Sequence, residues 1–176
     1  MKNRIFIVDD DASVCRSLVS LLGDEGYQVK SFGTVSGFRQ TVATNTVAVL
    51  MLDIALPDED GLSALPKIRA EFPEIEVVMI TGEATIQRAV LATKSGAYDF
   101  LEKPIDPARL LLTLRNLFAA IGLKRAVAVE RQDERYQIGQ RNPEGAAAHG
   151  LWSDPKFLAQ TGSADFNAKL NAGQFA

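Results

Sequence analysis

The sequence Val47-Ala48-Val49-Leu50-Met51-Leu52-Asp53 joins six consecutive apolar residues directly to a carboxylate. An uninterrupted apolar run of this length is typical of a strand that is buried on both faces. The turn-forming residues 56–61 follow it and end the strand. Asp53 is therefore expected at the carboxyl end of a buried strand, where open α/β sheets carry their chemistry. We take it as the candidate nucleophile.

Short apolar runs alternate with amphipathic stretches on both sides of this strand. The spacing predicts strands at 5–8, 27–32, 47–52, 77–80 and 97–101, and helices at 13–22, 36–43, 62–72, 85–93 and from Pro107 onward. Five successive strand–helix units predict an α/β fold, in which helices cover both faces of a five-stranded parallel, doubly wound sheet.

The composition narrows the possible classes of protein. The chain has 176 residues, 47% of them hydrophobic, and a formal net charge of -3, so no broad basic face is expected and direct contact with nucleic acid is not predicted. One cysteine and one histidine exclude a disulfide framework and a histidine-built metal cluster. The sequence has neither an apolar run long enough to span a membrane nor a signal-peptide pattern, so we expect a cytoplasmic protein.

Polar side chains stand where four of the predicted strands end. Asp9 and Asp10 follow the first strand, Asp53 the third, Thr81 the fourth and Lys103 the fifth. Alone, each has a common structural explanation as a helix cap, a turn or a loop. A parallel sheet brings these ends to one edge, however, and three carboxylates gathered there favour a hard divalent cation such as Mg²⁺. We expect Asp53 to attack phosphorus, with the metal and Lys103 neutralising charge and Thr81 donating a hydrogen bond.

Four segments resemble the receiver domain of two-component response regulators. They are Ile7-Val8-Asp9-Asp10-Asp11, Leu52-Asp53-Ile54-Ala55-Leu56-Pro57-Asp58-Glu59-Asp60-Gly61, Ile80-Thr81-Gly82 and Ala97-Tyr98-Asp99-Phe100-Leu101-Glu102-Lys103-Pro104. The resemblance covers roughly residues 3 to 121 and implies a flavodoxin-like (βα)5 fold. It also implies that a sensor histidine kinase or a phosphotransfer protein donates the phosphoryl group, and that the chain modifies itself and is not an enzyme. The last two segments are similar to those of receivers that precede a sigma-factor-activating ATPase or a helix-turn-helix domain.

The resemblance assigns the acceptor and the metal ligands. It implies that Asp53 is the phospho-acceptor, that Asp10 binds Mg²⁺ directly, and that Asp9 acts on the metal directly or through water. Ala55 would add its backbone carbonyl as a ligand. Ala55 and Glu83 would also line the route to the phosphoryl group, where this family tunes how long the phosphate survives.

The resemblance also assigns a switch. Thr81 and Lys103 would sense the phosphoryl oxygens, and Phe100 would be the aromatic residue that turns inward as Thr81 moves. Phe100 has no hydroxyl, so such a switch would act through ring packing; the alternative is that Phe100 is an ordinary core aromatic. Residues 85–118 would form the surface that binds a downstream protein or a second copy of the chain.

Two other functions remain open at this point. Asp9-Asp10-Asp11 also fits the opening motif of haloacid-dehalogenase-like phosphatases, with Thr81 and Lys103 as further motif residues. The sequence lacks the fourth motif of that family, and this alternative leaves Asp53 unused. The other possibility is an interaction module that works without phosphorylation. Nucleotide binding is not predicted, because no glycine-rich phosphate loop follows any strand.

The last third of the chain carries weaker patterns. Leu110, Leu114, Leu117 and Ile121 repeat at helical spacing, so we expect the last helix to continue, with an interruption at Gly122. We predict a receiver domain at 1–121, a helical linker or dimerising coiled coil at 122–140, and an irregular or disordered tail at 141–176 without a recognisable output domain.

Overall fold

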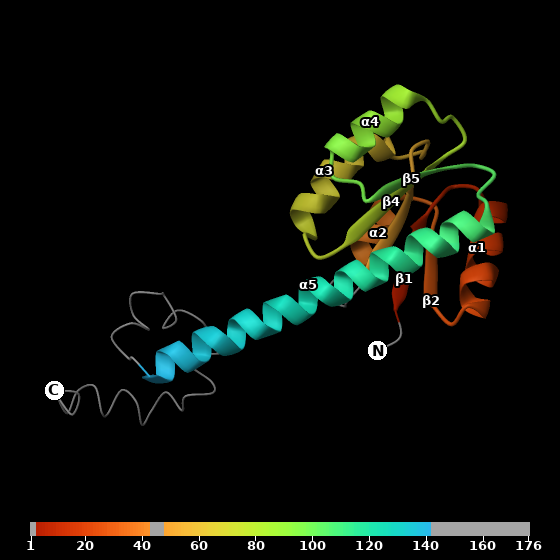
Figure 1. Cartoon of the computed structure of the whole chain (residues 1–176). Helices are drawn as coiled ribbons and strands as arrows, with labels where there is room; N and C mark the ends of the chain where they lie inside the picture. Colours follow the sequence, from red (N-terminus) through yellow and green to blue (C-terminus); the bar gives the residue numbers. More distant parts are fainter. Residues whose placement is uncertain (1–2, 43–47, 142–176) are drawn as a thin grey trace. The chain divides into compact units, whose positions relative to one another are not determined.

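The computed structural model describes residues 3–42 and 48–141, and the side chains of those residues up to Arg131. The chain divides after Ile121 into two units, and the sheet belongs to the first. The elements are β1 (Arg4–Val8), α1 (Ala12–Asp24), β2 (Gln28–Phe32), α2 (Val35–Thr41), β3 (Val49–Asp53), α3 (Gly61–Glu71), β4 (Glu76–Thr81), α4 (Ile86–Lys94), β5 (Asp99–Glu102) and α5 (Pro107–Arg141) (Figure 1).

The five strands form one parallel sheet in the order β2-β1-β3-β4-β5. Val8 lies beside Leu52 in the register of β1 and β3, and Asp53 lies beside Ile80 in the register of β3 and β4. Thr81 is the next residue after Ile80 and the last of its strand. The register therefore aligns the carboxyl ends of the central strands along one edge of the sheet.

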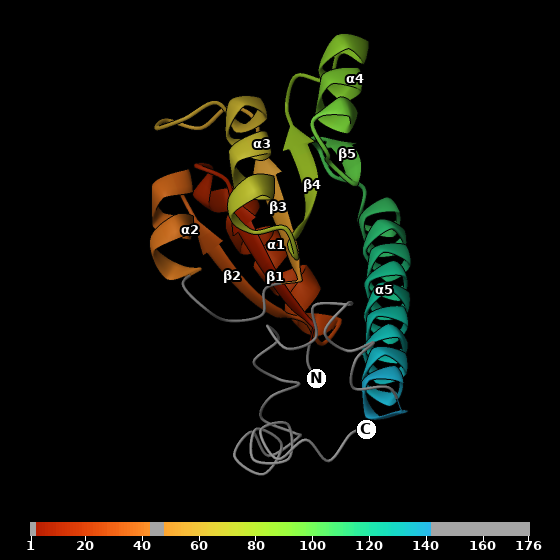
Figure 2. The ribbon, with the colours of Figure 1, turned by 90° about the vertical axis from the view of Figure 1, so that its left-hand side faces the viewer.

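Each face of the sheet carries its own apolar layer. Phe6 and Val8 of β1 pack with residues of α2, α3 and α4 on one face, whereas Ile5 and Ile7 pack with residues of α1 and α5 on the other (Figure 2). All five residues of β3 are buried, as its unbroken apolar sequence requires. The predicted five-stranded, parallel, doubly wound sheet is confirmed.

Polar side chains set where the first four helices begin. Each helix is preceded by a residue whose side-chain oxygen accepts a hydrogen bond from a backbone N–H of the first turn; these residues are Asp11, Thr34, Asp60 and Thr85. Such caps satisfy backbone donors that have no partner within the helix. They place the starts of these four helices after the loops that follow the carboxyl ends of β1 to β4.

The helices differ in how firmly they are anchored. Helix α3 buries Ala64, Leu65 and Ile68 together with its first residue, Gly61. In α4, which the structure describes in full, Ala92 alone is buried. Helix α4 is thus held against the sheet by a much smaller apolar contact than α3.

Helix α5 is longer and more regular than the sequence predicts. Its first turns bury Leu110, Leu114 and Leu117 against the sheet. The expected interruption at Gly122 is absent, and one helix runs from Pro107 to Arg141. A single interior glycine costs only about 1 kcal/mol of helix stability, which the surrounding helix formers offset. Apart from Arg141, the tail predicted at 141–176 lies outside the described residues. None of the helices described by the structure is both long and apolar enough to cross a membrane.

Candidate functional site

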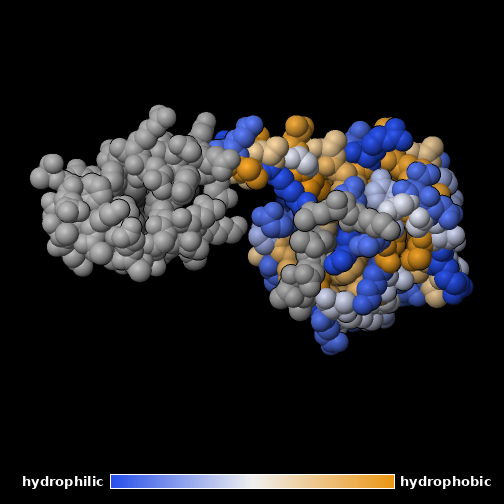
Figure 3. All heavy atoms as spheres, turned by 90° about the horizontal axis from the view of Figure 1, so that it is seen from below, coloured by the Kyte–Doolittle hydropathy of each residue, from blue (hydrophilic) through white to orange (hydrophobic). Residues whose placement is uncertain are grey.

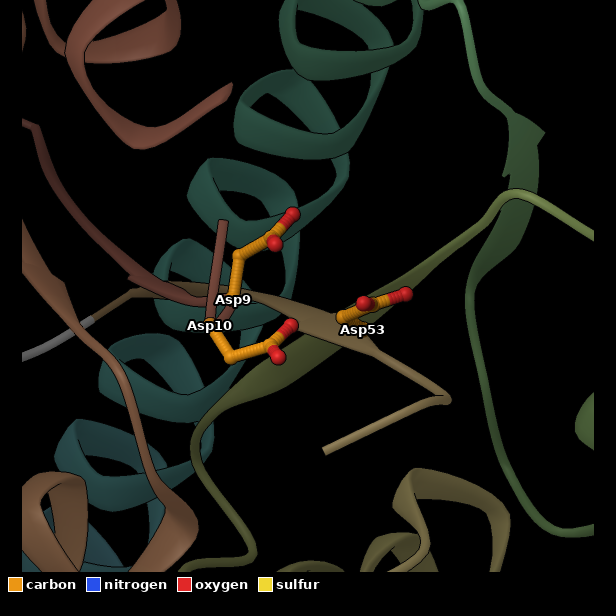
Figure 4. A group of neighbouring side chains, drawn as sticks. All are labelled: Asp9, Asp10 and Asp53. Carbon is orange, nitrogen blue, oxygen red and sulfur yellow. The ribbon is translucent and has the colours of Figure 1, made fainter. Parts of the chain in front are cut away.

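Three carboxylates gather at the carboxyl ends of β1 and β3. Asp9 and Asp10 directly follow β1, and Asp53 is the last residue of β3 (Figure 4). Each offers a carboxylate oxygen, and these oxygens all lie within 4.8 Å of one another. Asp9 and Asp53 are buried, with 1% and 3% of their surface exposed, whereas Asp10 is open to solvent. The cluster therefore has two buried charges and one exposed side from which a cation or a phosphoryl group can enter.

Lys103 extends from the loop after β5 into this cluster. Its Nζ lies 2.7 Å from Asp9 Oδ2 and 3.0 Å from Asp53 Oδ2. The side chain keeps 19% of its surface exposed. One ammonium thus pairs with both buried carboxylates, and the three aspartates keep an excess of negative charge.

The protonation equilibria of Asp53 and Lys103 reflect this arrangement. Burial raises the pKa of Asp53 above its usual range and the charge of Asp9 adds to this effect, although Lys103 and the N–H of Ile54 act in the opposite direction. Burial alone would lower the pKa of Lys103, but its bonds to Asp9 and Asp53 outweigh it and raise that pKa. A cation bound beside Asp53 would lower the cost of its ionised form.

Thr81 and Phe100 lie on the two strands beyond β3. Thr81 is 1% exposed, and its Oγ1 accepts a hydrogen bond of 3.1 Å from the backbone N–H of Glu83. Phe100 pairs with Met79 in the register of β4 and β5 and packs, half-buried, against the apolar layer that includes α3. A half-buried ring is compatible with both a switch and a core aromatic.

The loop after Asp53 requires a glycine at position 61, which the sequence did not reveal. A Cβ on Gly61 would lie 2.0 Å from the backbone oxygen of Asp53, so no other residue fits here without a shift. The N–H of Gly61 donates a 2.8 Å hydrogen bond to the carbonyl of Ile54. Ala55 is exposed between these fixed points. The sequence predicted only that residues 56–61 end the strand; the close approach of α3 to the Asp53 backbone appears only in the structure.

Known proteins resemble this chain over the same region. The family model of the response regulator receiver domain matches residues 5–115. NtrX of Azorhizobium caulinodans, a nitrogen assimilation regulatory protein, is 37% identical over 134 residues, which are 75% of this chain and 30% of that protein. TorR of Escherichia coli, the transcriptional regulatory protein of the TorCAD operon, is 30% identical over 78% of this chain and 60% of its own length.

Solved structures agree in fold. The beryllofluoride-activated NtrC4 receiver domain dimer is 36% identical, with a TM-score of 0.64 over 67% of this chain and 98% of that chain. NtrX of Brucella abortus in complex with ADP is 34% identical, with a TM-score of 0.68 over 73% of this chain and 30% of that chain. The chain thus spans about a third of the length of the NtrX proteins that it matches.

These matches settle the family and correct one expectation. TorR is named a transcriptional regulatory protein, so the prediction of no nucleic-acid partner does not hold across the relatives. The fold and the matched region favour a receiver over the haloacid-dehalogenase-like alternative. The chain belongs to the response regulator receiver family of two-component signal transduction.

Proposed function

We propose that Asp53 accepts a phosphoryl group while Mg²⁺ is held beside it, and that the modified domain changes its contacts with another protein. The observation that carries this proposal is the cluster itself. Three carboxylate oxygens lie within 4.8 Å of one another, and Lys103 Nζ lies 3.0 Å from the acceptor carboxylate. This supports the proposal, because a carboxylate that could accept a phosphoryl group, further acidic oxygens that could hold a metal and an ammonium lie close together.

The residues present fit Mg²⁺. This ion takes oxygen ligands, is commonly bound through one or two carboxylates, and keeps several waters. Asp9, Asp10 and Asp53 supply carboxylate oxygens, and their charge exceeds that of Lys103. Ala55 follows Asp53 by two residues and would contribute its backbone carbonyl. When bound, the metal would neutralise negative charge on the incoming phosphoryl group.

The transfer uses the side chains around Asp53. One carboxylate oxygen of Asp53 forms a bond to phosphorus while the bond from phosphorus to the donor atom breaks, and the donor keeps that electron pair. Lys103 is already charged and positioned at Asp53 Oδ2, so it can stabilise phosphoryl oxygens without a further rearrangement. The Thr81 hydroxyl can donate to the same group from the adjacent strand. Because the acceptor is part of the chain, we propose a switch that modifies itself and not an enzyme that turns over a substrate.

We propose residues 85–118 as the surface that changes partners. Several large apolar side chains are exposed there: Ile86, Val90, Leu91, Tyr98 and Leu112. A groove of about 450 Å³ is lined by α4 and β5 residues, and Phe100 and Arg109 contribute to it. Phe100 lines this groove, and its strand β5 pairs with β4, which ends in Thr81. We propose that a change at Asp53 reaches the groove through Thr81 and Phe100. The occupant is a downstream protein or a second copy of the chain.

Exposed apolar residues also lie beyond this surface. Figure 3 shows another view of the molecule, in which hydrophobic and hydrophilic residues are interspersed over the described part of the face. Beyond Ile121, Leu123 and Val127 are exposed one helical turn apart on α5. We keep a dimerising coiled coil and a plain helical linker as the two proposals for 122–140.

The donor and the process follow from the family. We propose a sensor histidine kinase or a phosphotransfer protein as the source of the phosphoryl group. Because TorR is named a transcriptional regulatory protein, we propose transcription as the process that the switch controls. The cytoplasmic location expected from the sequence stays a prediction.

The mass of the intact protein after incubation with acetyl phosphate tests the proposal. Wild type should gain one phosphoryl group when Mg²⁺ is present and none when Mg²⁺ is chelated. Asp53→Asn should gain none, whereas Asp24→Asn, which alters an exposed carboxylate of α1, should behave as wild type. An equal gain in wild type and Asp53→Asn would refute the assignment of the acceptor. No gain from acetyl phosphate or from a histidine kinase would favour the phosphorylation-independent module.

A further inference from the structure

The loop that follows Asp53 is held at both of its ends by backbone hydrogen bonds of Ile54. The N–H of Ile54 donates to the carbonyl of Ile80 on β4 over 3.2 Å. The carbonyl of Ile54 accepts hydrogen bonds from Leu56 at 3.2 Å and from Gly61 at 2.8 Å. Between these points Ala55 and Asp58 are exposed, so the apolar core does not hold the outer part of the loop.

Asp58 attaches that outer part to a different region of the chain. Its Oδ1 accepts a hydrogen bond of 3.2 Å from the N–H of Val35, and its Oδ2 accepts two of 2.9 Å from the N–H and the hydroxyl of Ser36. Both carboxylate oxygens are thus used at the start of α2. Slight burial opposes ionisation, but the hydrogen bonds from Ser36 and Val35 keep the pKa of Asp58 below its usual range.

A second contact reinforces the first. Glu59, the next residue, forms an ion pair of 3.2 Å with Arg39 of α2 and another with Lys67 of α3. Ion pairs this close to the surface contribute little on their own. The pair with Arg39 adds to the three hydrogen bonds of Asp58 in keeping the loop against α2, whereas the pair with Lys67 joins the loop to α3.

The sequence between the two attachments is stiff. Leu56-Pro57 joins Ala55 to Asp58, and the proline ring fixes the φ angle of Pro57. The residue before a proline is restricted as well, which limits Leu56. The Ala55 carbonyl shares its peptide group with the N–H of Leu56, which bonds to Ile54 on one side, and Asp58 holds the chain on the other, so few free dihedral angles remain to orient this peptide group.

We infer that Asp58 is a positioning residue for the metal site: it holds the loop against α2 and thereby orients the backbone carbonyl of Ala55 toward bound Mg²⁺. This inference rests on the proposed metal site. It adds a residue that contacts neither the metal nor the phosphoryl group and acts through the peptide between Ile54 and Asp58. Residues that orient metal ligands typically change metal affinity by ten- to a hundredfold when they are removed.

The alternative is that Asp58 serves only to start α2, and the chain offers a matched control for it. Thr34 also caps α2, because its Oγ1 accepts a 3.1 Å hydrogen bond from the N–H of Gly37. Thr34→Ala therefore weakens the start of the helix and leaves the carboxylate of Asp58 in place. Asp58→Ala weakens the same helix and also frees the loop.

The experiment titrates Mg²⁺ into the full chain and follows the midpoint of thermal unfolding, which rises as a ligand binds the folded state. Asp58→Ala should raise the Mg²⁺ concentration at half of the full shift by about tenfold. Thr34→Ala should lower the midpoint without Mg²⁺ but leave the half-shift concentration as in wild type. Ser36→Ala, which removes one hydroxyl, should give a smaller increase in that concentration.

Two outcomes would overturn the inference, and they are distinguishable. If Asp58→Ala and Thr34→Ala both lower the midpoint and neither changes the half-shift concentration, Asp58 only supports α2. If wild type itself shows no Mg²⁺-dependent shift, the proposed metal site fails and the role of Asp58 fails with it. The double variant Asp58→Ala/Ser36→Ala should bind Mg²⁺ no more weakly than Asp58→Ala, because both changes remove the same contact.

Discussion

Gly61→Ala adds a single methyl group at the point where α3 begins, next to the end of β3. The new Cβ would lie 2.0 Å from the backbone oxygen of Asp53 and 2.9 Å from both its carbonyl carbon and the Cα of Ile54. Carbon and oxygen atoms normally approach to about 3.3 Å, so α3 and the end of β3 must separate by about 1 Å. Both are backbone segments that belong to the buried core, and no flexible side chain can absorb the shift.

The expected cost follows from this displacement. Overpacking a closely packed site typically destabilises a protein by about 1 to 3 kcal/mol. Alanine is a better helix former than glycine, which returns at most about 1 kcal/mol. We therefore expect Gly61→Ala to lower the free energy of unfolding by about 1 to 2 kcal/mol. The same shift moves the backbone of Asp53, so Mg²⁺-dependent phosphorylation should slow even where the variant remains folded.

Urea denaturation measures the first effect, and a second glycine supplies the control. Gly23 lies inside α1 with nothing within 4 Å of an added Cβ. Gly23→Ala should therefore raise the free energy of unfolding by about 0.5 to 1 kcal/mol. The two variants make the same chemical change and should shift stability in opposite directions. The steric argument would be refuted if Gly61→Ala were as stable as wild type.

Three further predictions concern the charges of the site. Asp53→Asn should stabilise the Mg²⁺-free protein at pH 7, because it removes a buried carboxylate whose ionised form is disfavoured by burial. Burial raises the pKa of Asp53. The stability that its protonated form provides is therefore present below about pH 4 and is lost as the pH rises through the raised pKa. The urea midpoints of the variant and wild type should converge at acidic pH. Lys103→Gln should destabilise the protein by about 3 to 5 kcal/mol at pH 7, because Asp9 and Asp53 lose their shared partner. In wild type the stability that charged Lys103 provides is present below about pH 10.4 and is lost as the pH rises through its raised pKa, so Lys103→Gln should show a weaker alkaline transition. Mg²⁺ at ten times its dissociation constant should stabilise wild type by about 1.4 kcal/mol, and chelation should reverse this gain. Asp10→Asn should need a far higher Mg²⁺ concentration for the same stabilisation. An unchanged Mg²⁺ concentration would exclude Asp10 as a ligand.

Much of the fold could be predicted because each buried strand has a simple sequence pattern. Residues 47–52 form an unbroken apolar run because β3 is covered on both faces. The gathering of Asp9, Asp10 and Asp53 was predictable from the same pattern, because parallel strands end at one edge of their sheet. Lys103 could be placed at that edge, but its shared position between two carboxylates could not, because side-chain conformation decides it.

What the sequence did not reveal depends on contacts between distant segments. Asp58 bonds to residues that precede it by more than twenty positions, and nothing in its own neighbourhood indicates that partner. Gly61 looks like any turn glycine until the backbone of Asp53 is placed next to it. The continuity of α5 through Gly122 is not evident from the glycine itself, because the helix-forming residues on both sides of it offset its cost.

The small buried contact of α4 sets how much free energy the proposed switch requires. Its buried apolar contact is the single methyl group of Ala92, whereas α3 buries Ala64, Leu65 and Ile68. Burying a methylene-sized group is worth only about 0.8 kcal/mol, so repositioning α4 breaks little of the core. Even one new hydrogen bond to a phosphoryl group, at about 1.5 to 3 kcal/mol for charged partners, exceeds that cost. Of these two helices, α4, which carries the exposed Ile86 and Val90, is thus the one that the proposed modification of Asp53 would displace at the smaller cost in buried apolar contact.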